Sequence, residues 1–133
     1  MIKKIEHLGI AVRNMDESND TFKKLLGSAS YKMETVEREG VITSFFQVGE
    51  SKIELLQATN EESPIARFLA KSKEGIHHIA LDVDDIYQEM KRLREEGFVL
   101  LSDEPKKGAD GKIIVFLHPK STNGVLIELC QDA

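Results

Sequence analysis

The strongest constraint on the fold of this chain is that its sequence contains two copies of one pattern. Residues 5–12 (IEHLGIAV) align with residues 76–83 (IHHIALDV) at a shift of 71 positions, and this shift places His7 on His78. Both segments are rich in Ile, Leu and Val, as strands are. An internal repeat of this kind predicts two copies of one structural unit.

The ends of the two copies also match. Residues 51–56 align within residues 124–130 at a shift of 74 positions, which places Glu54 on Glu128. An insertion of three residues in the second copy accounts for the change of shift. Each copy therefore carries one histidine and one glutamate at equivalent places.

The first copy predicts a strand, a helix and three further strands. After the strand at 5–12, Asn14 is a good N-cap, with Glu17 at the spacing of a capping box. Gly27 is expected to end the helix. Turn residues then separate strands that are expected at residues 31–37, 41–48 and 52–57.

The second copy repeats this plan. After the strand at 76–83, Asp84 or Asp85 is expected to cap a helix that ends before Gly97. Residues 106–111 (KKGADG) predict a turn-rich loop. The remaining strands are expected at residues 98–102, 112–117 and 124–130.

These elements predict an α+β fold of two βαβββ modules that form paired curved sheets. We expect one domain over residues 1–133, with module one at 1–58 and module two at 76–133. The connector at 59–75 contains Ser63-Pro64, an N-cap followed by proline at the first helical position, and therefore predicts a short helix.

The composition excludes several classes of protein. With a net charge of −5, the 133-residue chain lacks the overall basic character of a nucleic-acid binder. One cysteine, Cys130, rules out an intramolecular disulfide and is expected to be a small core residue. The sequence shows neither a membrane span nor a signal peptide, so we expect a cytoplasmic protein.

The matched residues predict a metal site. Zn, Ni, Co and Mn all accept imidazole nitrogen together with carboxylate oxygen. A glutamate inside an apolar strand is costly to bury without a partner, and this occurs twice. We therefore expect His7, Glu54, His78 and Glu128 to bind a divalent ion, with His77 as the rival to His78.

Longer motifs resemble the vicinal oxygen chelate superfamily, and within it the methylmalonyl-CoA epimerase family. The resemblance covers nearly the whole chain, and its most specific part is residues 116–129. The residues that carry it are Glu6-His7-Leu8-Gly9-Ile10-Ala11, Lys52-Ile53-Glu54-Leu55-Leu56, Ser63-Pro64-Ile65-Ala66, Gly75-Ile76-His77-His78-Ile79-Ala80, Asp103-Glu104-Pro105-Lys106-Lys107-Gly108 and Phe116-Leu117-His118-Pro119-Lys120-Ser121-Thr122-Asn123-Gly124-Val125-Leu126-Ile127-Glu128-Leu129.

The resemblance implies interconversion of the (2R) and (2S) epimers of methylmalonyl-CoA through an enolate. It carries the metal positions onto the same four residues and gives Glu128 the roles of ligand and base. For the second base we predict Glu54, from its equivalent place in the repeat. Members with two catalytic glutamates carry one where this chain has Thr43, which is a departure from the family pattern.

The phosphates of coenzyme A need cationic partners. Lys106, Lys107 and Lys120 lie near the loops of the second copy and could meet them as point charges. His118 precedes Pro119 at the end of a strand, and we expect a turn residue there, with substrate contact as the second interpretation.

Other functions stay open at this point. A glyoxalase of the same superfamily can use the same four ligand types, but its last-strand turn is typically Asp-Pro-Asp-Gly, unlike residues 118–124 here. An extradiol dioxygenase would use two His and one Glu. A drug-binding resistance protein would need an aromatic groove, and this chain has no Trp. Superfamily members often form dimers, so a homodimer is expected.

Overall fold

Strand β1 (Ile2–Ala11) belongs to two groups of strands in the computed structural model, which describes all of residues 1–133. Contacts divide the chain into two compact units. The first unit is His7–His77, and the second unit is Met1–Glu6 together with His78–Ala133. The division therefore falls inside β1. Organisation as a single domain with boundaries at 58 and 76 stays a prediction.

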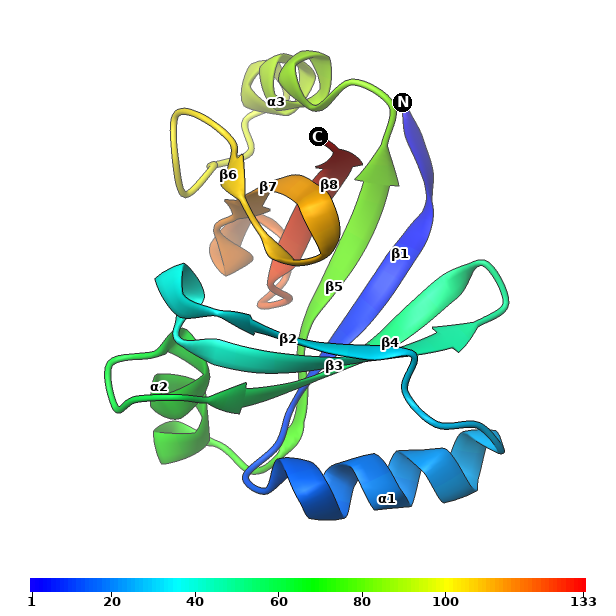
Figure 1. Cartoon of the computed structure of the whole chain (residues 1–133). Coiled ribbons are helices and arrows are strands. Elements are labelled where there is room, and N and C mark those ends of the chain that lie inside the picture. The colour runs from blue at the N-terminus through cyan, green and yellow to red at the C-terminus, as the bar shows by residue number, and fades with distance from the viewer. The chain divides into compact units, whose positions relative to one another are not determined.

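The first unit contains a four-stranded sheet in the order β2-β3-β4-β1 (Figure 1). Strands β2, β3 and β4 pair antiparallel, whereas β1 and β4 pair parallel. The elements that follow β1 are α1 (Met15–Leu26), β2 (Lys32–Val36), the 3-10 turn η1 (Glu37–Glu39), β3 (Val41–Val48), β4 (Ser51–Ala58) and α2 (Pro64–Lys71).

The second unit repeats this order. The start of β1 is followed across the sheet by β5, β8, β7 and β6. Strands β5 and β8 pair parallel, whereas β7 pairs antiparallel with both β8 and β6. The elements are β5 (Gly75–Val83), α3 (Ile86–Glu95), β6 (Lys106–Lys107), η2 (Ala109–Gly111), β7 (Lys112–Leu117), η3 (Pro119–Ser121) and β8 (Ile127–Asp132). Two βαβββ modules are thus confirmed.

Within each sheet, alternation separates the face that α1 or α3 covers from a face that carries polar residues. In the first unit, α2 covers the end of this second face, where Leu56 packs with Ile65. In the first unit, Leu55 and Phe46 pack with Phe22 of α1. In the second unit, Val115 and Leu129 pack with Met90 of α3. The histidines and glutamates singled out by the repeat have the opposite parity, so they lie on the other face of their sheets.

The helix starts repeat as closely as the strands. The side chains of Asn14 and Asp85 each accept a hydrogen bond from the backbone N–H of the third residue of the helix that follows. Asp85, not Asp84, is therefore the N-cap of α3. The Gln57 side chain accepts a hydrogen bond from the backbone of Met15, and Gln131 does the same for Ile86, both at 2.6 Å.

None of the helices has the length and apolar character that a membrane span requires.

One predicted strand was wrong. Residues 98–102 form only an isolated bridge, between Leu100 and Leu117. The strand at the edge of the sheet is instead β6 (Lys106–Lys107), which lies within the segment that was predicted to be a loop. The sequence did not predict β6 because its two residues are exposed and charged. Only the apolar run at residues 98–102 has the composition of a strand.

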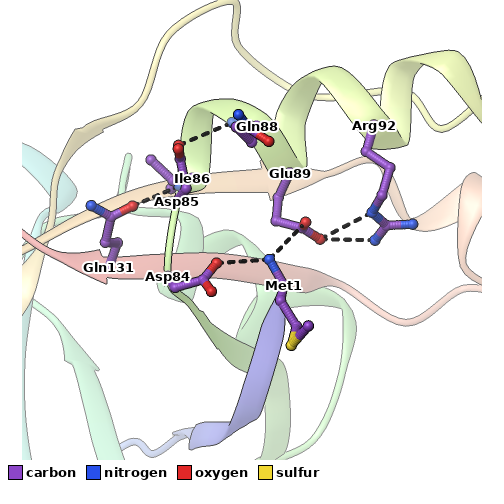
Figure 2. Close-up of polar contacts among 8 residues, drawn as sticks. All are labelled: Met1, Asp84, Asp85, Ile86, Gln88, Glu89, Arg92 and Gln131. Atoms are coloured by element: carbon purple, nitrogen blue, oxygen red, sulfur yellow. Dashed lines mark hydrogen bonds and ion pairs between the residues drawn. The ribbon is translucent and has the colours of Figure 1, made fainter.

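Polar contacts fasten the chain start to α3 within the second unit (Figure 2). The ammonium of Met1 donates to Asp84 Oδ1 at 2.7 Å and to Glu89 Oε2 at 3.0 Å. Arg92 donates to the other oxygen of Glu89 from two nitrogens, at 2.8 and 3.2 Å. Glu89 is buried, and each of its two carboxylate oxygens has a cation beside it that offsets the cost of burying the charge.

Candidate metal centre

The first unit places one histidine beside one glutamate. His7 lies on β1 and Glu54 on β4, and the parallel register sets Gly9 opposite Glu54. The distance between His7 Nδ1 and Glu54 Oε2 is 3.1 Å, and both residues are about 95% buried, with exposures of 5% and 4%. A carboxylate this deep in a sheet needs a proton, a hydrogen-bond donor or a cation beside it.

The second unit repeats the arrangement. His78 lies on β5 and Glu128 on β8, with Ala80 opposite Glu128. His78 Nε2 lies 3.3 Å from Glu128 Oε1, and the two residues are 6% and 5% exposed. In both units the histidine precedes the register partner of the glutamate by two residues. Each unit thus contains one buried His–Glu pair, and the joint ligand set of His7, Glu54, His78 and Glu128 stays a prediction.

A phenylalanine accompanies each pair, which the sequence argument did not single out. Phe45 lies opposite Glu54 on β3, and Phe116 lies opposite Glu128 on β7. The ring of Phe116 meets that of His78 edge-on, with 5.6 Å between centroids. The two phenylalanines are 71 residues apart, so the shift that pairs the histidines could have found them.

The donor set fits a divalent ion of the borderline class. Imidazole nitrogen and carboxylate oxygen are ligands that Zn, Co, Ni and Mn share. Two neutral imidazoles and two carboxylates carry a charge of −2, which balances a dication. The chain thus offers His and Glu ligand groups suited to a metal.

The rival histidine faces a different environment. His77 precedes His78 on β5, so its side chain points to the opposite face of that strand. Its ring meets Phe68 of α2 edge-on, with 5.1 Å between centroids. This aromatic contact gives His77 a packing role and supports His78 as the equivalent of His7.

The predicted coenzyme A contacts do not all share a face. Lys106 lies opposite Ile114, and Lys107 lies opposite Ile113. Because Ile114 has the parity of Phe116 and Glu128, Lys106 lies on the glutamate face, and Lys107 lies on the face that α3 covers. The sequence missed this difference because it did not predict β6 as a strand.

Lys120 and His118 lie in and before the short turn η3. His118 Nδ1 accepts a hydrogen bond from the backbone of Lys120 at 3.1 Å, so the expected turn role of His118 is confirmed. Lys120 also lines a surface cavity of about 380 Å³. The other residues of that cavity are Glu96, Gly97, Phe98, Val99 and Ser121. Substrate contact by either residue stays a prediction.

Comparison with known proteins identifies the class to which this fold and these residues belong. The chain belongs to the Glyoxalase/Bleomycin resistance protein/Dioxygenase superfamily, whose family model matches residues 6–116. Within it, the chain is similar over nearly its full length to methylmalonyl-CoA epimerases, which confirms the resemblance found in the sequence.

Three relatives illustrate the similarity. The mitochondrial methylmalonyl-CoA epimerase of Dictyostelium discoideum is 45% identical over 96% of this chain and 78% of its own length. The ethylmalonyl-CoA/methylmalonyl-CoA epimerase of Cereibacter sphaeroides is 43% identical over 98% of this chain and 99% of its own. A solved methylmalonyl-CoA epimerase in complex with methylmalonyl-CoA and NH4+ has a TM-score of 0.95 at 34% identity, covering 100% of this chain and 96% of that one.

Proposed function

We propose that this protein is a metal-dependent epimerase that interconverts (2R)- and (2S)-methylmalonyl-CoA. The observation that carries the proposal is the buried His–Glu pair, found once in each half of the repeat. Its support is the family: relatives that are 43–45% identical and cover nearly all of this chain are named as epimerases of this substrate.

We propose that the two pairs supply one ion. Each pair alone offers two ligands, whereas ions of this class take at least three from a protein. His7, Glu54, His78 and Glu128 together give four ligands and the charge that a dication requires. The physiological ion is Co, Mn, Ni or Zn, and its availability decides among them.

The reaction breaks a carbon–hydrogen bond next to a thioester. When bound, a divalent ion would draw electron density from the thioester and carboxylate oxygens and so lower the energy of the enolate. Glu128 is proposed to accept the α-proton. Apolar neighbours, Phe116 among them, keep water from the carboxylate.

Epimerisation also needs a proton donor on the other side of the carbon. The repeat predicts Glu54 for this role. Replacing Glu54 with Gln keeps an oxygen ligand and removes the titratable group. Full metal content with full turnover in Glu54→Gln would show that Glu54 is a ligand and not a base.

The coenzyme A end is proposed to lie along the second unit, with Lys106 as a phosphate contact. Lys106→Glu should raise KM for the acyl-CoA and leave metal content unchanged, because the lysine is outside the ligand set. Lys107→Glu is the matched control, because Lys107 is the next residue along β6 and its side chain lies on the opposite face from that of Lys106. Equal effects of the two variants would contradict this placement.

The decisive experiment is proton–deuterium exchange at the α-carbon of methylmalonyl-CoA in heavy water, followed by NMR. The protein is assayed with added Co(II) and again after chelation. Metal-dependent exchange with loss of stereochemical purity supports the epimerase. If no exchange occurs although one ion is bound per chain, methylmalonyl-CoA is not the substrate. A glutathione hemithioacetal then tests the glyoxalase function.

Substrate preference, assembly and location complete the proposal. Ethylmalonyl-CoA is the comparison substrate, because the Cereibacter sphaeroides relative is named for both acyl groups. A homodimer is proposed because members of the superfamily often form dimers, and a cytoplasmic location is proposed from the sequence. Light scattering after gel filtration at several concentrations measures the assembly state.

A further inference from the structure

The two phenylalanines that accompany the His–Glu pairs differ in their surroundings. Phe45 of the first unit is fully buried. Phe116 of the second unit is only partly buried, and Leu101 beside it is 53% exposed. We propose that Phe116 and Leu101 form an apolar wall that receives the alkyl group of the acyl-CoA and limits its size, an assignment that rests on the proposed function.

The strand register places Phe116 beside the His–Glu pair of its own unit. Phe116 on β7 lies directly opposite Glu128 on β8. Residues directly opposite one another project to the same face of a sheet, with their Cβ atoms about 5 Å apart. The ring of Phe116 also meets that of His78 edge-on, with 5.6 Å between centroids. An apolar ring therefore stands next to both polar side chains.

Leu101 extends the row of Glu128 and Phe116 by one more residue. Leu100 and Leu117 form an antiparallel bridge, so the next residue, Leu101, lies opposite Phe116. The backbone N–H of Leu101 donates to the carbonyl oxygen of Phe116 at 2.8 Å. Because Leu100 packs against the core that α3 covers, the side chain of Leu101 projects to the other face, which carries the glutamate.

The Phe116 ring has a rigid backing. It packs against a buried cluster of Ala80, Ile114 and Cys130 in the second unit. Closely packed interiors resist even the change of one methylene. A ring held in this way cannot retreat from a longer alkyl group, so it can discriminate by size.

The equivalent row of the first unit is closed. Lys32 lies opposite Phe45, and its ammonium is 5.1 Å from the centroid of that ring. The ring of Tyr31 lies 5.8 Å from the same ring. The row of the first unit therefore ends in a cation over a covered ring, whereas that of the second unit ends in an exposed leucine. An alkyl group is stabilised by contact with exposed apolar surface, which the second row offers.

The chemistry of the substrate brings its alkyl group to this row. The alkyl group is bonded to the α-carbon, and this reacting carbon has to lie beside the polar pair. The wall begins about 5 Å from Glu128, within reach of a substituent on that carbon. The enolate is planar at the α-carbon, and its alkyl group lies in the plane whichever epimer formed it. One wall at the side therefore serves both epimers.

The test measures kcat/KM for methylmalonyl-, ethylmalonyl- and propylmalonyl-CoA with Co(II) present. Leu101→Ala widens the wall at an exposed position. It should raise the ratio of ethylmalonyl to methylmalonyl turnover by about 10-fold or more, since one methylene against an apolar wall changes discrimination by about 10–200-fold. Leu101→Phe should lower the same ratio. Each shift should be equal for reactions started from either epimer.

Phe116→Leu tests the ring itself and should also favour the longer alkyl groups. Phe116 packs against the buried cluster and the His78 ring, so this variant also changes stability and metal binding. The ratio of two substrates on one preparation is independent of the fraction of protein that is folded and loaded with metal. The ratio therefore reports the wall alone.

Two matched controls are available in the first unit. Phe45→Leu makes the same substitution at the equivalent place opposite a glutamate, and it should leave the substrate ratio unchanged. Leu25→Ala removes the same atoms as Leu101→Ala from an α1 side chain that is 70% exposed, and it should also leave the ratio unchanged. Metal content of Leu101→Ala should equal that of the wild type.

Three outcomes decide the assignment. An active wild type with unchanged ratios in Leu101→Ala and Phe116→Leu would overturn the wall and leave the epimerase function intact. An equal shift in Phe45→Leu would also overturn it, because general loosening would then explain the change. A wild type that acts on none of the three acyl-CoAs would instead remove the proposed function, and the wall with it.

Discussion

Two glutamates on apolar strands are buried beside histidines, although a lone buried carboxylate is among the costliest groups in a protein interior. The neighbouring residues show how local the polar positions are. Ile53, Leu55, Ile127 and Leu129 point to the helix faces of their sheets, with Leu55 and Leu129 fully buried. Each strand therefore turns one buried glutamate to the ligand face and uses its neighbours to stabilise the fold.

Cys130 lies two residues after Glu128 and is fully buried. Burial raises the pKa of its thiol far above the ordinary range, with the nearby charge of Glu128 as a smaller cause. Since the thiolate is the reactive form, Cys130 should resist alkylating reagents in the folded protein. Mass spectrometry after iodoacetamide should show labelling only in denaturant; rapid labelling of the native protein would contradict this burial.

Which residues could be foreseen depended on whether the signal was in the repeat. The pairs His7–Glu54 and His78–Glu128 were predicted because both members recur at equivalent places. Phe45 and Phe116 were not, because an apolar residue in a strand does not by itself indicate a site. Their positions opposite Glu54 and Glu128 follow from strand register, which depends on the pairing of distant segments and cannot be read from one segment alone.

Among the elements, the helices were predicted closely because their end signals are local. Asn14 and Asp85 each accept a hydrogen bond at a helix start. Replacing either with Ala should lower the free energy of unfolding by about 1 kcal/mol. Denaturant titration measures this loss, and Asn14→Ser should restore most of it because serine also caps helices. An unchanged stability in both Ala variants would contradict the capping role.

Strands with weak sequence signals were predicted less well. β6 is two lysines long, so no alternation of apolar and polar residues can reveal it. Residues 98–102 look like a strand because Phe98 and Leu100 are apolar, yet these side chains pack against the core of the second unit outside any regular ladder. Apolar composition here reported burial and not pairing.

The chain start gives a pH dependence within the second unit. Hydrogen bonds to Asp84 and Glu89 raise the pKa of the Met1 ammonium above 8.0, and the bond from Arg92 is the first cause that lowers the pKa of Glu89 below 4.5. The stability from the raised group is complete below pH 8 and is lost as pH rises through its folded pKa. The stability from the lowered group is complete above pH 4.5 and is lost as pH falls.

Glu89→Gln should therefore destabilise a protein that begins at Met1 most strongly between about pH 5 and 8. The difference from wild type should shrink on both sides of that range. Denaturant midpoints at a series of pH values measure it, with Glu95→Gln on the exposed side of α3 as the control. A difference that is constant with pH would show that packing, not charge, explains the role of Glu89.

For the whole molecule, the repeat has a consequence for how a metal would affect stability. Each unit contains its own core and its own His–Glu pair, so a metal that needs ligands from both pairs would couple the stability of the two units. A bound ion stabilises the folded state by about 2.7 kcal/mol when its free concentration is 100 times its dissociation constant. Unfolding midpoints with Co(II) and with chelator measure this increment, and elemental analysis counts the ions.

Single substitutions then distinguish one shared ion from two separate ions. If one ion is shared, His7→Ala and His78→Ala should each remove most of the Co(II) increment, and the wild type should bind one ion per chain. If each pair held its own ion, either variant would keep about half of the increment, and the wild type would bind two. The first pattern is expected because two protein ligands hold a dication weakly, whereas four give it a closed set.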